Sequence, residues 1–444
     1  METPIYKALT NILSKDASRF HMPGHKGRDY CGLFGGVMQY DITEIQGADS
    51  LYEAGEAILR CEEWLADYYG AKRSLISCQG STLCIQTMLS LVRHRGSRLV
   101  IGRNAHVAAS NAMALLDFEP VWVYPVTDSI TGVTGAVTPE QVEVALRSQA
   151  DVAAVYITSP SYYGVFSDIA AIAAVCSRYN VPLLVDNAHG AHLKAAGYPH
   201  PIAQGAAMCC DSAHKTLPVI TGGAYLHIAQ DEYVEPAKEA MAVFGSTSPS
   251  YLIMLSLDTC LSYLQDSAEK DFHALRSKIA VLEQLALQKG FTPIPNQGDH
   301  TRMLLCAYHL GYSGEQLAAH LRAFKVEPEY VGENTVVLLP SPLNTEQDFE
   351  RLTNAINGIE PRDNIPALVP PPIKASVGCH PREAFMARKK IIPVRNSLGR
   401  IVAANKSSCP PGVPVVYCGE LITEEAVRLL TAYGYETVTV IDNK

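Results

Sequence analysis

Short apolar runs alternate with amphipathic stretches between residues 74 and 228, and this alternation restricts the fold more than any other feature of the chain. The runs are expected strands, at 74–77, 99–101, 121–126, 152–158, 183–185, 208–210 and 224–228. Helical patterns such as 138–149 and 167–179 lie between them, each opened by a Thr or Ser cap. Strands that alternate with helices predict an α/β fold with a doubly wound, mostly parallel sheet.

The length of 444 residues allows more than one domain. We predict five parts, which are an N-terminal arm (1–50), a large α/β domain (51–255), a small α/β domain (256–360), a proline-rich linker (361–374) and a C-terminal α+β module (375–444).

Composition narrows the classes of partner. Hydrophobic residues make up 48% and charged residues 18%, as in a globular protein, and the net charge is -9. This charge, without a long basic run, argues against nucleic acid or an anionic membrane as a partner. No apolar run reaches the length of a signal peptide or membrane span, so we expect a cytoplasmic protein. The 12 cysteines lack a C-x-x-C pair and are expected to be reduced thiols.

One lysine lies where chemistry is expected. Lys215 follows the apolar run 206–210 in the cluster DSAHKT, before a second apolar run begins after Gly222 and Gly223. A lysine in such a turn is costly to desolvate as an ammonium, and a neutral amine can form a Schiff base with a carbonyl. Asp186 ends another apolar strand, and ligands of open α/β sheets bind at the carboxyl ends of such strands. Asp186 can instead be read as a helix cap.

A phosphate site is expected where Gly80, Ser81 and Thr82 lead into an apolar helix, because free backbone N–H groups and hydroxyls gather at that point. A plain Ser/Thr cap is the alternative.

Two further alternatives concern the whole protein. Asp186, His189 and His192 have the spacing D-x-x-H-x-x-H of a metal-dependent hydrolase, although this leaves Ser-x-His-Lys and Gly-Ser-Thr unexplained. The chain could also be a non-catalytic, regulatory relative of an enzyme.

Nearly the whole chain resembles the ornithine/lysine/arginine decarboxylases, which are pyridoxal-phosphate enzymes of the aminotransferase-like fold. The segments that carry the resemblance are FHMPGHKG (20–27), DITEIQGADSLYEAGEAI (41–58), QGSTLCIQTML (79–89), RNAHVAASNA (103–112), YITSPSYYGVFSDI (156–169), VDNAHGAHL (185–193), DSAHKTLPVITGGAYLH (211–227) and GSTSPSY (245–251). A weaker match is CPPGVPVVYCGE (409–420).

The resemblance implies pyridoxal 5'-phosphate held on Lys215, with roles for a set of neighbours. Asp186 would keep the ring nitrogen protonated, His106 would stack on one face of the ring, and Ala188 would leave room at the other. The phosphate would be held by Ser81, Thr82, Ser212 and His214, and His189 would contact the cofactor or the substrate carboxylate. Thr247 and Ser248 would reach the phosphate of a neighbouring subunit, which implies a homodimer or higher homo-oligomer with shared sites.

The implied reaction converts arginine, lysine or ornithine to its amine and CO2, within polyamine biosynthesis. An aminotransferase, aldolase or decarboxylase of the same fold that acts on a non-basic amino acid is the alternative. Relatives commonly carry acidic residues where this chain has Arg395, Asn396 and Ala404, and a tyrosine where it has Cys409. We therefore expect the N-terminal arm to read the substrate's distal cation, through Glu44, Asp49 or Glu53.

Overall fold

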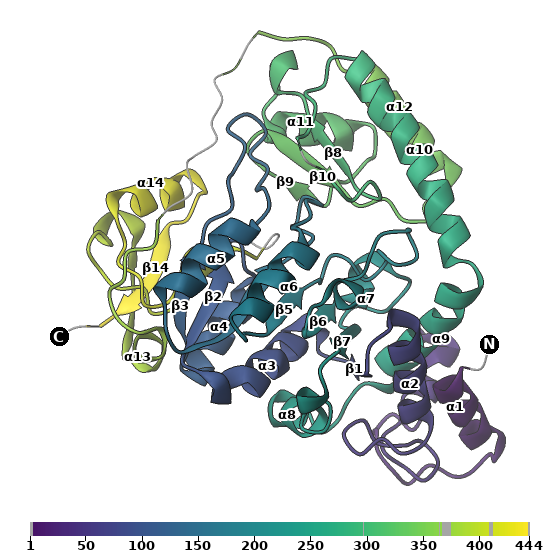
Figure 1. Ribbon diagram of the computed structural model, residues 1–444. Helices are drawn as coiled ribbons and strands as arrows, with labels where there is room; N and C mark the ends of the chain where they lie inside the picture. The colour runs from purple at the N-terminus through teal and green to yellow at the C-terminus, as the bar shows by residue number, and fades with distance from the viewer. Residues whose placement is uncertain (1–2, 296, 364, 366–373, 408–411, 443–444) are drawn as a thin grey trace. The chain divides into compact units, whose positions relative to one another are not determined.

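A computed structural model describes residues 3–295, 297–363, 365, 374–407 and 412–442 (Figure 1). The chain divides into two compact units. The first contains Met1–Leu91 and Leu183–Asp271, and the second contains Val92–Pro182 and Phe272–Lys444.

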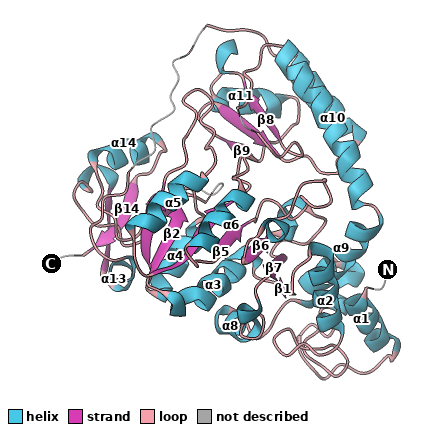
Figure 2. Ribbon diagram, viewed as in Figure 1, coloured by secondary structure: helices cyan, strands magenta, loops and turns pink. Residues whose placement is uncertain are grey.

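The main sheet has the strand order β1-β7-β6-β5-β4-β2-β3 (Figure 2). Its strands are β1 (Arg73–Ser77), β2 (Arg98–Gly102), β3 (Glu119–Val123), β4 (Val152–Thr158), β5 (Leu183–Asp186), β6 (Met208–Asp211) and β7 (Ala224–Ile228). The pairs β5·β6, β2·β4 and β2·β3 are parallel, whereas β7 runs antiparallel to β6 and β1. The predicted large, mostly parallel sheet is confirmed.

Helices pack around the strands of the first unit. They are α1 (Pro4–Ser14), α2 (Ala57–Tyr69), α3 (Gly80–Val92), α7 (Ala213–Thr216), α8 (Ala237–Phe244) and α9 (Tyr251–Asp266). Helix α1 packs against both α2 and α9, as Figure 1 shows. The periodicity of residues 51–69 predicts a helix that begins at residue 51 and ends at Gly70. In the structure α2 begins only at Ala57, because residues 50–56 wrap around the Asp49 carboxylate. Gly70 ends α2 in the left-handed conformation (φ 74°), as predicted.

The sheet strands of the second unit alternate with α4 (Val107–Leu116), α5 (Pro139–Ser148) and α6 (Ile169–Arg178). Thr138 caps α5 in a capping box with Gln141, as the sequence predicted. The predicted Ser/Thr cap of α6 was wrong, because Asp168 accepts the bond from the Ala171 N–H.

Two smaller sheets complete the second unit. After α10 (Ala268–Gln288), an antiparallel sheet of order β8-β10-β9 is accompanied by α11 (Gly314–Ala323) and α12 (Glu346–Asn357). Its strands are β8 (Met303–Cys306), β9 (Tyr330–Val331) and β10 (Thr335–Leu338). Most of the predicted linker, 364 and 366–373, lies outside the described residues.

The C-terminal part of the second unit has a core of its own. Its elements are α13 (Pro381–Met386), β11 (Lys389–Pro393), β12 (Lys406–Ser407), β13 (Pro414–Val416), α14 (Glu424–Ala432) and β14 (Thr437–Ile441), with the pairs β11·β14 and β12·β13. Val402, Leu430 and Val440 are fully buried in that core. Short 3-10 turns occur at Gly35–Tyr40, Arg93–Arg95, Pro201–Gln204, Asp231–Tyr233, Tyr308–Leu310 and Val394–Asn396. Among the described helices, none combines the length and apolar character that crossing a membrane requires.

Candidate active site

Two neighbouring strands of the first unit bring the predicted site residues together. β5 and β6 are parallel, with Asp186 in register with Cys210, so both strands end at the same edge of the sheet. Asp186 is the last residue of β5, and α7, which carries Lys215, follows β6 after a single residue. The strand-end rule therefore places the predicted carboxylate and the predicted lysine on adjacent loops.

The lysine amine meets a histidine across the two loops. Lys215 Nζ lies 3.1 Å from Nε2 of His189, and both side chains are partly buried. At this distance one of the two nitrogens donates a proton and the other accepts it. The pair is therefore a place where a proton can be held beside a nucleophilic amine.

The predicted phosphate site lies at the N-terminus of α3. Ser212 Oγ donates to Ser81 Oγ over 2.8 Å, which joins the β6 loop to the start of this 13-residue helix. Gly80 has φ +66°, and a Cβ at that position would meet no atom within 4 Å. Thr82 is exposed beside it. Hydroxyls, the N-terminus of a helix and open space together suit a phosphate dianion.

His214 is oriented toward the same strand end. Its Nδ1 lies 2.9 Å from the Gly223 carbonyl oxygen, and because a carbonyl only accepts, Nδ1 carries the proton. Burial and the neighbouring charge of Lys215 hold the pKa of His214 below its ordinary value, although the bond to Gly223 acts in the opposite direction. His214 is therefore neutral at pH 7, with Nε2 as its second polar atom.

Asp186 and Ala188 are buried beside these groups. Asp186 is 1% exposed, and its Oδ1 accepts from the Ala188 N–H over 3.1 Å. Ala188 is 4% exposed and adds only a methyl group. A buried carboxylate next to a small side chain fits a flat heteroaromatic ring with a protonated nitrogen. The donor set as a whole, with an amine, a carboxylate and three hydroxyls, fits pyridoxal phosphate.

His106 belongs to the second unit. It caps α4, with Nδ1 accepting from the Ala108 N–H over 3.2 Å. Gly412 approaches the ring so closely that a Cβ there would lie 2.5 Å from His106 Nε2. The residue is thus fixed within its own unit, and its stacking role remains a proposal.

The acidic residues of the arm differ in what they contact. Asp49 accepts from the backbone N–H groups of Ser50, Gly55, Glu56 and Ile58 over 2.8–3.0 Å. Although burial opposes the change, these bonds hold the pKa of Asp49 below its ordinary value. Glu44 and Glu53 are exposed. The carboxylate of Asp49 thus organises the loop before α2, whereas those of Glu44 and Glu53 face solvent.

The segment 245–251 packs on the arm. Tyr251 Oη donates to the Asp49 carbonyl over 2.6 Å, and a Cβ at Gly245 would lie 1.8 Å from Tyr52 Oη. Thr247 and Ser248, within that segment, are exposed. The Ser246 N–H also donates to Gln79 Oε1 over 3.4 Å. Three segments that carry the family resemblance, 41–58, 79–89 and 245–251, therefore meet in the first unit.

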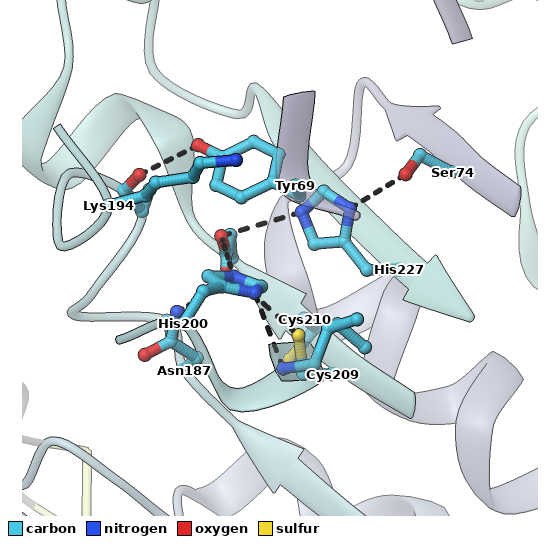
Figure 3. Close-up of polar contacts among 12 residues, drawn as sticks. Tyr69, Ser74, Asn187, Lys194, His200, Cys209, Cys210 and His227 are labelled. Atoms are coloured by element: carbon cyan, nitrogen blue, oxygen red, sulfur yellow. Dashed lines mark hydrogen bonds and ion pairs between the residues drawn. The ribbon is translucent and has the colours of Figure 1, made fainter. Parts of the chain in front are cut away.

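A different polar network includes Asn187, His200 and His227 (Figure 3). The Asp211 carboxylate, at the end of β6, accepts from Asn187 Nδ2 over 2.6 Å and lies 3.1 Å from His200 Nε2. His227, on β7, approaches the same carboxylate at 3.5 Å. Burial alone would raise the pKa of Asp211, but the two histidines hold it well below its ordinary value. Motif reading missed this network, because its partners come from separate elements.

The metal alternative gains no support at its predicted residues. In the described part of the chain, the possible ligands that gather within 4.8 Å of one another are His200, Cys209 and Asp211, a group that does not include Asp186, His189 or His192.

In the C-terminal part, Arg395 and Asn396 are exposed on a 3-10 turn and Ala404 is partly buried. Cys409 lies outside the described residues.

Comparison with known proteins bears on both fold and family. A family model described as "Orn/Lys/Arg decarboxylase, major domain" matches residues 3–289. The uncharacterized protein YaaO of Bacillus subtilis is 30% identical over 97% of this chain and 94% of its own length. An arginine decarboxylase of Bacillus subtilis is 26% identical over 97% of this chain and 93% of its own. The structure of constitutive lysine decarboxylase from E. coli superposes with a TM-score of 0.80 at 17% identity, covering 99% of this chain and 82% of that one.

Proposed function

Because the chain belongs to the ornithine/lysine/arginine decarboxylase family, we propose that it decarboxylates a basic L-amino acid with pyridoxal 5'-phosphate bound at Lys215. The enzyme class follows from the family, whose named members among the relatives are arginine and lysine decarboxylases. The observation that supports the site is the junction of the two strand-end loops, where Lys215 meets His189 and Ser212 meets Ser81.

The cofactor would be held at three points. Lys215 would hold it covalently, Asp186 would face the ring nitrogen, and the hydroxyls at the start of α3 with His214 would bind the phosphate. Bound pyridoxal phosphate supplies an electron sink for the pair of electrons left when the bond to the α-carboxylate breaks. His106 stays the proposed stacking residue, on the strength of the resemblance.

The chain's own groups would set the electrostatics and move the proton. The buried Asp186 carboxylate would favour a proton on the ring nitrogen, because a negative charge stabilises a nearby cation. Without this carboxylate, the protonated nitrogen would be a buried cation that lacks its partner. Departure of CO2 leaves a carbon that must gain a proton, and Lys215 Nζ and His189 Nε2 share one at 3.1 Å. We assign the delivery of this proton to the Lys215–His189 pair.

The arm would read the substrate's distal cation. Glu44 and Glu53 present carboxylates to solvent, whereas Asp49 is occupied by backbone N–H groups, so the proposal narrows to the two glutamates. Exposed Thr247 and Ser248 are proposed to serve the phosphate of a second copy in a homodimer. The described cysteines are free thiols, which supports a reducing, cytoplasmic setting.

The test is to add pyridoxal phosphate, treat with borohydride and map the modified lysine. We expect a visible absorption band and modification at Lys215 in the wild type, and neither in Lys215→Ala. Lys194→Ala is the control, because Lys194 is another lysine of the first unit, and its amine contacts Tyr68 rather than the residues of the site. CO2 release is then measured over arginine, lysine, ornithine and neutral amino acids. A wild type that takes up no cofactor would refute the proposal, and a preference for a neutral amino acid would refute the basic substrate alone.

A further inference from the structure

The two loops of the site are joined a second time, deeper in the first unit. Asn187 directly follows Asp186, and Asp211 directly precedes Ser212. Asn187 Nδ2 donates to Asp211 Oδ1 over 2.6 Å, and both residues are fully buried. The backbone repeats the link, since the Asn187 N–H donates to the Cys210 carbonyl over 2.9 Å. The loop of the carboxylate and the loop of the lysine are therefore joined at their base by two buried hydrogen bonds, one from a side chain and one from the backbone.

The acceptor in the side-chain bond is a carboxylate kept charged by imidazoles (Figure 3). His200 Nδ1 faces the Ile202 N–H at 3.4 Å, so Nδ1 is the acceptor and Nε2 carries the proton that points at Asp211. His227 Nδ1 is hydrogen-bonded to Ser74 Oγ over 2.8 Å. Its Nε2 faces Oδ2 of Asp211, the oxygen that His200 also approaches. Burial lowers the pKa of His227, so this ring is neutral.

The same hydrogens argue against a metal ion among His200, Cys209 and Asp211. A metal would need the lone pair of His200 Nε2, but that nitrogen is protonated in this network. Burial also raises the pKa of the Cys209 thiol, which disfavours the thiolate that binds metals. The cluster is therefore accounted for as a buried carboxylate with hydrogen-bond donors around it.

Packing fixes the other side of the Asn187 amide. A Cβ at Gly190 would lie 2.1 Å from Asn187 Oδ1 and 2.6 Å from Leu193 Cδ1, so the amide rests directly on the backbone of Gly190. Tyr69 Oη donates to the Ala191 carbonyl over 2.7 Å and holds the next part of the loop. The amide of Asn187 thus has a defined position on both sides.

We propose that Asp211 and Asn187 are positioning residues, which hold Asp186 and His189 at a fixed distance from Lys215 without touching the cofactor. This inference rests on the proposed function. A buried hydrogen bond to a charged acceptor, which contributes more than one between neutral groups, joins the loops below the point where the cofactor would bind. Weakening this hydrogen bond would change the position of Lys215 relative to Asp186 and His189. Every side chain proposed to bind the cofactor would still be present.

The experiment uses three variants of the protein. Two are the single variants Asp211→Asn and Gly190→Ala, and the third is a double variant that combines Asn187→Asp and Asp211→Asn. Readouts are the dissociation constant of pyridoxal phosphate from the visible band, the fraction of Lys215 fixed by borohydride, and kcat and KM separately. Both single variants are expected to weaken cofactor binding about tenfold or more and to lower kcat with little change in KM. The double exchange again sets an amide opposite a carboxylate, and we expect it to bind cofactor better than Asp211→Asn.

The matched control is Asp258→Asn, an equally buried aspartate of the first unit that contacts α1 and not the loops. Its cofactor affinity should equal that of the wild type. The positioning role alone would be overturned if the wild type is modified at Lys215 and both single variants bind cofactor and turn over substrate as the wild type does. A wild type without cofactor binding would overturn the proposed function as well. A stoichiometric metal ion in the purified protein would also overturn the inference.

Discussion

The guanidinium of Arg103 and the carboxylate of Glu420, 317 positions apart, form a buried two-point ion pair. Nη1 lies 2.8 Å from Oε1 and Nη2 lies 2.9 Å from Oε2. The guanidinium also lies 4.7 Å from the ring centre of Trp122 and 4.1 Å from that of Tyr417. Tyr417 Oη lies within hydrogen-bonding distance of the Arg103 and Ala105 carbonyls, so the C-terminal part of the unit holds the turn that leads to His106.

Glu420→Ala is expected to destabilise the protein by about 3–5 kcal/mol, because it leaves a buried arginine without its partner. Urea unfolding measures this difference. Glu119→Ala is the matched control, since Glu119 pairs with Arg98 at 3.0 Å on exposed side chains, and such pairs contribute about 0–1 kcal/mol. Equal losses in the two variants would show that the Arg103–Glu420 pair is no more important than a surface pair.

Asp258 gives the stability a pH dependence. Burial raises the pKa of Asp258 from 3.8 to about 6, although the Tyr6 N–H donates to it over 2.9 Å. Below about pH 3 the carboxyl is protonated in both folded and unfolded chains and has no effect on stability. As pH rises toward 6, only the unfolded chain ionises freely, and above 6 the folded protein carries the full cost of a buried charge.

Asp258→Asn is therefore expected to stabilise the protein above pH 6, by on the order of 2–3 kcal/mol, and to have almost no effect below about pH 3. Thermal unfolding of both proteins across this range measures the difference. Asp266→Asn, on the exposed side of the same helix, should change nothing at either pH. A gain at about pH 3 as large as that at about pH 8 would mean that the ionisation of Asp258 is not its cause.

Asp186→Asn is expected to bind pyridoxal phosphate but to lose about 10²-fold or more in kcat, because an amide supplies no charge to hold the ring nitrogen protonated. Cofactor titration and CO2 release measure the two effects separately. Asp168→Asn serves as the control, since asparagine caps a helix as well as aspartate does. Normal turnover in Asp186→Asn would place the ring elsewhere.

The arm proposal predicts that Glu44→Gln or Glu53→Gln lowers kcat/KM for the preferred basic substrate about 10-fold to 100-fold, the loss of one charge-assisted hydrogen bond. Activity on neutral amino acids should not fall. Glu63→Gln, on the exposed side of α2, is the control. Unchanged specificity in both arm variants would assign recognition of the substrate to another part of the protein.

Sequence reasoning succeeded where the signal is local. β4 and β7 were predicted to the residue, because continuous apolar runs bounded by polar residues define buried strands. Asp186 and Lys215 were predicted because ligands bind at strand ends, and the structure places them on adjacent loops. The start of α2 was misplaced, since four N–H groups that converge on Asp49 outweigh helical periodicity. The partners of Asp211 were beyond prediction, because His200, His227 and Asn187 approach it only once the sheet has formed.

The Arg103–Glu420 pair also has a consequence for synthesis on the ribosome. At about 5–20 residues per second, the 317 positions between the partners take roughly 15–60 s to translate. Throughout that interval the nascent chain carries Arg103, Trp122 and the turn to His106 without the glutamate and tyrosine that later cover them. The second unit can therefore be completed only after residue 420 has been translated. A ribosome that stalls before codon 420 would release a chain whose arginine has no counter-charge to bury with, a species suited to chaperone capture or proteolysis.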